Sequence, residues 1–157
     1  MSCNLVILGE HFDIDAFLAK SKLRGYSKNY KGEPMFKSKP DGRKLAHSQV
    51  GIQTSKAGFD NLEKQIKDTT QYLKKHKDKL CHIKTTQGIE LALLDFGIAL
   101  RIDRKKILMQ TDRFPNELVK LAGEIGLDIE LAIYPVDMQS ILEKRQSKKK
   151  VIERKDK

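Results

Sequence analysis

Tryptophan is absent from the 157-residue sequence, and aromatic residues make up only 6% of it. Cysteine is scarce as well: Cys3 and Cys81 form no recognisable framework, which argues against a small secreted domain held together by disulfides. We expect both to be buried free thiols in a reducing cytoplasm. No apolar run approaches the roughly 20 residues that cross a bilayer, and "MSCNLVILGEHFD" lacks the basic n-region of a signal peptide. These absences predict a cytoplasmic protein without a membrane span.

The signatures of several large enzyme families are also missing. The sequence contains no G-x-x-x-x-G-K-S/T phosphate loop, no G-x-G-x-x-G fingerprint, no H-E-x-x-H and no G-x-S-x-G. These absences exclude only the families that use those motifs. Because no nucleophile, base and orienting group stand at a plausible spacing either, we predict that the protein is not an enzyme and uses no cofactor or metal.

Positive charge is concentrated at one end of the chain. The net charge is +10, and residues 144–157 alone hold eight Lys or Arg and two acidic residues, which leaves only +4 for the rest. With 39% apolar and 33% charged residues the composition is polar but globular. We predict a single domain over residues 1–142 and a basic tail over 143–157. The tail is expected to be disordered or helical and to contribute solubility more than function.

Hydrophobic periodicity predicts alternating strands and helices. Asp13 is the expected cap of the first helix, Thr111 or Asp112 that of the last, and Gly126 the glycine that ends the last helix. A short strand near Met35-Phe36 is conceivable in the long loop, and "IALRID" and "KKILMQT" suggest two short strands or one irregular strand. In chain order the pattern predicts a strand at 3–8, a helix after 13, a loop at 24–44, a strand at 45–55, a helix at 59–80, a strand at 89–96, a helix from 115 and a strand at 127–133.

This order indicates an α+β fold, with helices on one face of a mostly antiparallel sheet. A faint internal echo connects "HFDIDAFLAKSKLRG" with "RFPNELVKLAGEIGL": each runs from an aromatic residue through a cap region and a short amphipathic helix to glycine. A diverged ferredoxin-like β-α-β repeat would explain the echo, although short helices also resemble one another by chance.

Two polar clusters could carry chemistry, and each also has a structural explanation. The first contains Glu10, His11, Asp13 and Asp15 at a strand-to-helix junction, where it could hold a metal or an acid/base pair, or cap a helix. The second contains His76, Cys81 and His82. It lacks the second cysteine pair of a zinc site, and a histidine near a helix end explains it more simply.

The loop at 24–44 mixes cations with aromatic residues. Such a mixture suits a phosphate backbone, a protein surface or a solvated loop with no partner. The candidate protein-binding residues are Arg24, Tyr26, Lys28, Tyr30, Lys31 and Arg43. A nucleic-acid site would instead combine this loop with the helix at 59–80 and the tail, through Lys67, Lys74, Lys75, Lys148, Lys149 and Lys150.

The segments "LVILGEHFDIDAFLAKSKLRGYSKNYKGE" and "PNELVKLAGEIGLDIELAIYP" resemble a family of small bacterial α+β domains of unknown function. The resemblance covers residues 5–135 and implies a stand-alone cytoplasmic protein, similar in size and layout to the immunity proteins of toxin systems. This sequence has "HSQVGIQTS" where the family's middle strand carries Trp, and it lacks the proline expected before Lys31-Gly32. The family supplies no catalytic residues.

The sequence therefore predicts a non-enzymatic protein-binding domain, an immunity-type inhibitor of a bacterial toxin whose matching surface is acidic. The competing hypothesis is nonspecific nucleic-acid binding through the loop, the long helix and the tail. A flexible tail fixes no register and reads no base edges, so its own attraction to nucleic acid should fade near physiological salt.

Overall fold

The computed structural model describes residues 3–102 and 107–135, and the structural statements below concern these residues. Its centre is one five-stranded sheet with the strand order β2-β3-β1-β4-β5. In chain order the strands are β1 (Asn4–Gly9), β2 (Ser27–Asn29), β3 (Ser48–Gln53), β4 (Leu91–Ala99) and β5 (Asp128–Tyr134).

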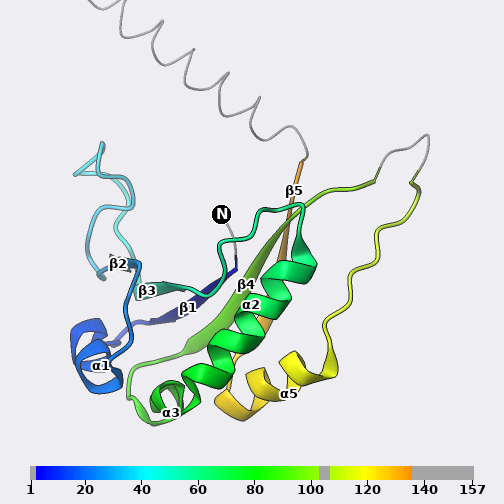
Figure 1. Cartoon of the computed structure of the whole chain (residues 1–157). Coiled ribbons are helices and arrows are strands. Elements are labelled where there is room, and N and C mark those ends of the chain that lie inside the picture. The colour runs from blue at the N-terminus through cyan, green and yellow to red at the C-terminus, as the bar shows by residue number, and fades with distance from the viewer. Residues whose placement is uncertain (1–2, 103–106, 136–157) are drawn as a thin grey trace, which may run out of the picture.

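Helices cover one face of this sheet. Figure 1 shows α2, α3 and α5 side by side in front of it, and α1 beside β1 and β3. The predicted α+β fold is confirmed, and three of the four strand pairings are antiparallel. The helices are α1 (Ile14–Ser21), α2 (Leu62–Lys75), α3 (Lys77–Leu80), α4 (His82–Thr85) and α5 (Asn116–Ile125).

The helices of the two echoing segments, α1 and α5, connect their strands in different ways. α1 connects β1 to β2, and these two strands run parallel with β3 between them. This is the arrangement of a split β-α-β unit. α5 instead connects β4 to β5, which are adjacent and form the only hydrogen-bonded parallel pair among the described strands. The ferredoxin-like repeat is therefore not confirmed.

The core lies between the sheet and the helices. Leu5 and Ile7 alternate along β1 with their side chains fully buried, and Ile14 and Phe17 of α1 belong to the same buried cluster. The predicted helix start is confirmed, since the Ala16 N–H donates to Asp13 Oδ1 at 2.9 Å. The apolar residues of β1 therefore pack against the apolar face of α1.

The long helix predicted at 59–80 is two helices. α2 ends at Lys75, and α3 begins at Lys77 after His76, whose φ of −115° is not helical. Near Met35-Phe36 there is no strand among the described residues. The short strand is β2 instead, and an isolated bridge joins Pro34 to Lys44.

Two further details of the prediction are corrected near α5. Neither Thr111 nor Asp112 caps the helix: Pro115 stands at the cap position without a side-chain hydrogen bond, and Asp112 binds the guanidinium of Arg101. Gly126 ends the helix with φ of +87°, as predicted. Strand β4 continues through Ile98-Ala99, and residues 100–102 and 107–115 contain no further strand, only a bridge at Ile107. The basic tail lies outside the described residues.

None of the helices in the described part of the chain is long and apolar enough to cross a membrane.

Asp95 is a partly buried carboxylate on the sheet face opposite the helices. Burial, and then the nearby charge of Glu130, raises its pKa above the ordinary value. A raised carboxyl pKa in the folded state means that folding stability falls as the pH rises from the unfolded pKa of 3.8 through the folded one.

We therefore expect Asp95→Asn to raise the melting temperature at pH 7. The gain should be modest, about 2–4 °C, because the side chain is partly exposed. Melting curves at pH 7 and pH 3 test the sign: the difference between variant and wild type should shrink at pH 3, where Asp95 is protonated in both states. A gain of equal size at both pH values would contradict the electrostatic explanation.

Candidate functional site

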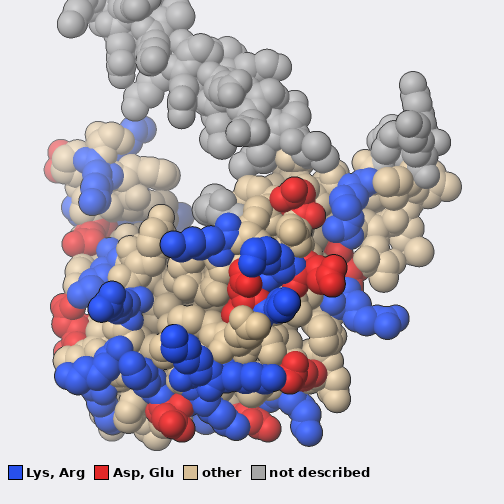
Figure 2. Space-filling model, viewed as in Figure 1, with Lys and Arg blue, Asp and Glu red and all other residues tan. Residues whose placement is uncertain are grey.

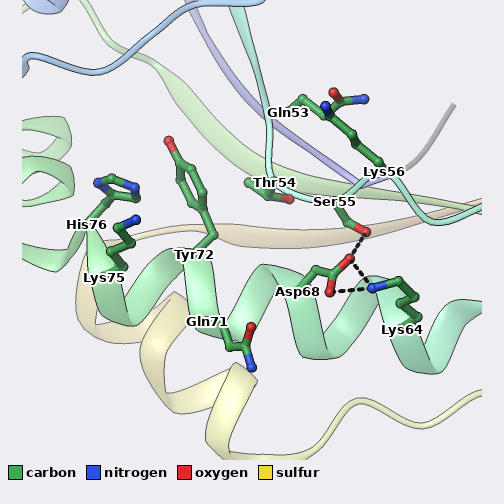
Figure 3. Close-up of a pocket in the computed structure, with 10 residues that line it drawn as sticks. All are labelled: Gln53, Thr54, Ser55, Lys56, Lys64, Asp68, Gln71, Tyr72, Lys75 and His76. Atoms are coloured by element: carbon green, nitrogen blue, oxygen red, sulfur yellow. Dashed lines mark hydrogen bonds and ion pairs between the residues drawn. The ribbon is translucent and has the colours of Figure 1, made fainter.

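Two adjoining hollows form one groove between α2 and the end of β3. They share Gln53, Tyr72 and His76, and their volumes are about 560 and 250 Å³. Figure 3 shows the larger hollow, with α2 as one wall and the chain that leaves β3 as the other. The smaller hollow continues the groove toward the C-terminal end of α1, at Lys22.

The lining of this groove is strongly basic. Six Lys or Arg residues face a single carboxylate, Asp68, which gives a net charge of +5. Residues 1–143 carry only +4 in total, so the remainder of the body is slightly acidic. Figure 2 shows Lys and Arg side chains gathered over the face that carries α2. The six cations are Lys22, Arg24, Lys56, Lys64, Lys75 and Lys79.

Most of these cations have no acidic partner. Lys64 Nζ lies 3.0 Å from Asp68 Oδ1, and this contact is the first cause of the lowered pKa of Asp68. Lys79 Nζ donates to the Lys22 carbonyl at 3.4 Å. The other four, which form no ion pair with any described residue, are called the free groove cations below: Lys22, Arg24, Lys56 and Lys75.

Local structure explains how distant cations meet. One face of α2 presents Lys64, Asp68 and Lys75, because residues three, four or seven apart lie along the same side of a helix. The opposite wall is fixed by buried hydroxyls: Thr54 Oγ1 lies 2.9 Å from Thr69 Oγ1 of α2 and donates to the Cys3 carbonyl.

On the α1 side, Lys22 caps the helix in a left-handed conformation, with φ of +54°. The chain therefore turns at this residue and carries Arg24 into the groove.

His76 and Tyr72 occupy the middle of the groove. Their rings lie 4.5 Å apart, and Figure 3 shows the side chains of Tyr72, on α2, and His76, the residue that follows the helix, on the same side of the helix. Burial lowers the pKa of His76, and the charges of Lys79 and Lys75 lower it further. Its Nδ1 is buried and has no hydrogen-bond partner among the described residues. The imidazole is thus neutral at pH 7 and adds an aromatic surface between cations.

Several predicted loop residues are engaged within the protein. Lys28 Nζ and the Tyr30 hydroxyl both bind Asp15, at 2.6 and 3.0 Å. Lys31 Nζ binds Glu10 at 2.8 Å. Two acids of the cluster at the start of α1 therefore pair with two cations of the loop, although the sequence predicted the cluster and the loop as separate features.

The remaining loop residues are separated. Arg24 lines the groove, while Tyr26 lies two residues further on with 75% of its surface exposed. Arg43 is exposed in the loop, and its carbonyl accepts from the Met35 N–H.

The lysines predicted for nucleic acid do not form one surface. Of the three on α2, Lys75 lines the groove, whereas Lys67 and Lys74 line a different hollow beside α5. Lys74 is paired there with Glu117 at 2.6 Å. Lys148, Lys149 and Lys150 lie outside the described residues. The candidate residues predicted from the sequence do not include Lys22, Lys56, Lys64 or Lys79. The spacing of Lys64 and Lys75 on the helix is the only local pattern that indicates part of this set.

The two cysteines differ. Cys3 is buried, as predicted, and burial raises the pKa of its thiol to about 11. Cys81 is exposed, so the expectation of two buried thiols is wrong for this residue. Its Sγ donates to the Asp78 carbonyl. Across the described residues, no three His, Cys, Asp or Glu side chains come together in a way that could hold a metal ion.

Comparison with known proteins adds no assignment. Neither a protein-family model nor a curated protein nor a solved structure matches this chain. The resemblance to small bacterial α+β domains remains an expectation drawn from the sequence, and the function has to be argued from the groove itself.

Proposed function

We propose that this protein is a non-enzymatic binding domain whose groove receives an acidic surface of a partner protein, in the manner of an immunity-type inhibitor of a bacterial toxin. The observation that carries the proposal is the group of four free groove cations. Like charges gathered without counter-charges raise the electrostatic free energy of the unbound protein, and an acidic partner relieves that repulsion.

The position of the cations suits protein recognition. A concave surface of one sign concentrates the field, attracts an oppositely charged partner and accelerates its association. Arg24 lies at one end of the groove and is followed closely by the exposed Tyr26. Arginine and tyrosine are among the residues that most often dominate binding energy at protein interfaces. We therefore assign the groove the electrostatic attraction and this end of it the anchoring contacts.

The polar groups in the groove are occupied in ways that favour binding over catalysis. The Ser55 hydroxyl donates to Asp68 at 2.9 Å, and Lys64 holds the same carboxylate in its ionised form. A general base would need a raised pKa and a free lone pair directed at a nucleophile. Asp68 has a lowered pKa and bonds to two neighbours instead.

Nucleic acid is the second candidate ligand, and Tyr72 is the observation that favours it. Its ring stands among the cations, and proteins that bind single strands combine a basic groove with aromatic rings on which bases stack. Filter binding of the full chain and of a chain ending at Glu143 tests this candidate. Tight binding of nucleic acid by both chains at physiological salt would support this candidate. Binding by the full chain alone, and only at low salt, would show nonspecific attraction by the tail and would count against the groove as a nucleic-acid site.

Affinity capture tests the protein-partner proposal directly. The full chain, immobilised and exposed to nuclease-treated lysate of its native host, should retain a locally acidic protein that raised salt releases. A lysate without nuclease treatment serves as the comparison. Recovery of no protein partner, or recovery only where nucleic acid bridges, would contradict the proposal.

A further inference from the structure

The sheet has a second face, which the helices do not cover. Strand register identifies its residues: on β1 they alternate with Leu5 and Ile7, which point into the core. Val6 stands opposite Leu93 of β4, and Leu8 stands opposite Leu91. Four aliphatic side chains therefore adjoin one another on this face: Leu93 is only 9% exposed, the other three are partly exposed, and no described helix packs over them.

Beside this apolar patch the uncovered face is acidic. The register places Asp95 next to Glu130 and Leu93 next to Asp128. No strand position on this face holds Lys or Arg. Asp95 Oδ1 is buried without a hydrogen-bond partner among the described residues. The two faces of the sheet thus carry opposite charge: the side with the groove is basic, and the uncovered face is acidic.

From the end of β5 downward, the face changes character in a fixed order. Near Tyr134 it consists of small residues, Gly97 and Ala132, and of aromatic rings. The Phe59 ring lies 4.8 Å from the ring of Tyr134. The carboxylates Asp95, Glu130 and Asp128 follow. The aliphatic patch at Leu93 and Leu91 comes last.

The chain beyond β5 has residues that match these three zones of the face in the same order: apolar, then basic, then aliphatic. Residues 136–142 include Met138, Ile141 and Leu142. Residues 144–150 are "KRQSKKK", with five cations, and the aliphatic pair Val151-Ile152 comes next. We propose that the C-terminal segment 136–157 docks on the uncovered sheet face, its cations against the three carboxylates and Val151-Ile152 against the aliphatic patch.

The reach of the chain is sufficient. The strand residues from Ala99 to Leu91 span about 26 Å at about 3.3 Å per residue. Residues 136–152 cover the same length even in a helix, at about 1.5 Å per residue. The segment begins beside the face that it would cover, so the closing loop is short and costs little entropy. Docking would add a third layer to a two-layer fold. It does not depend on the function proposed for the groove.

A spin label on the tail of the full chain tests the inference. Gln146→Cys in a Cys81→Ser background supplies the attachment site, since Cys3 is buried. We expect the label to cause a loss of methyl NMR signal from Val6, Leu8, Leu91 and Leu93, with little loss from core methyl groups near α3. Raised salt should restore part of the signal.

Charge reversal on the face provides the matched comparison. Asp128→Lys with Glu130→Lys should abolish the loss, because the tail would then meet repulsion. Asp41→Lys with Asp78→Lys makes the same change of net charge elsewhere and should preserve it; neither of these residues forms an ion pair with a described residue. Two outcomes would overturn the inference: no loss in the labelled chain, or a loss seen only between labelled and unlabelled molecules, which would assign the face to a second copy.

Discussion

Reversing two free groove cations, Arg24→Glu with Lys75→Glu, should weaken capture of the acidic partner by about 100-fold, since like charges facing each other across an interface cost several kcal/mol. Arg24 lines the smaller hollow of the groove, and Lys75 lines the larger one. Neither takes part in an ion pair with another described residue, so their removal breaks no internal salt bridge. Titration of the immobilised variant against host lysate, with the retained partner quantified, measures the change.

The control is Lys37→Glu with Lys39→Glu. This pair changes the net charge equally but lies in the exposed loop, outside the groove. It should lower capture only slightly, and circular dichroism should show that both variants are folded. Equal weakening by the two pairs would indicate a response to net charge alone and would count against the groove as the binding site.

Gly88→Ala, at the turn before β4, should lower the free energy of unfolding by about 3 kcal/mol or more. Gly88 has φ of +81°, and an added Cβ would lie 2.3 Å from the carbonyl oxygen of His11. The turn also meets the end of β1, where the carbonyl group of Gly88 itself leaves no room for a Cβ on Gly9. Thermal melting should show a fall of roughly 6–12 °C for a chain of this size.

Gly123→Ala is the control, and it should raise stability instead of lowering it. This glycine lies within α5, and nothing approaches within 4 Å of the position of an added Cβ. Alanine there should raise stability by about 0.5–1 kcal/mol, because it reduces the entropy lost on helix formation. If Gly88→Ala melts at the wild-type temperature, the close approach between Gly88 and His11 is not required for stability.

Local patterns in the sequence determined the elements of the fold. The continuous apolar run at residues 3–8, the cap at Asp13 and the glycine at position 126 each act over a few residues, and each predicted its element correctly. The α+β class followed from their order. Helix ends and short strands were predicted less well: the break at His76 and the strand β2 depend on packing and pairing with distant segments.

Only the tertiary structure decided which charges are free. The sequence shows Lys28 and Lys31 as loop cations, but folding brings Asp15 and Glu10 to them across 13 and 21 residues of chain. It also gathers Lys22, Lys56 and Lys75 from three separate elements and gives them no counter-charge among the described residues. Ion pairing depends on separations of a few ångströms, which residue order does not encode except within one helix or hairpin. Composition therefore determined that the protein is basic, whereas packing determined where that charge is available to a partner.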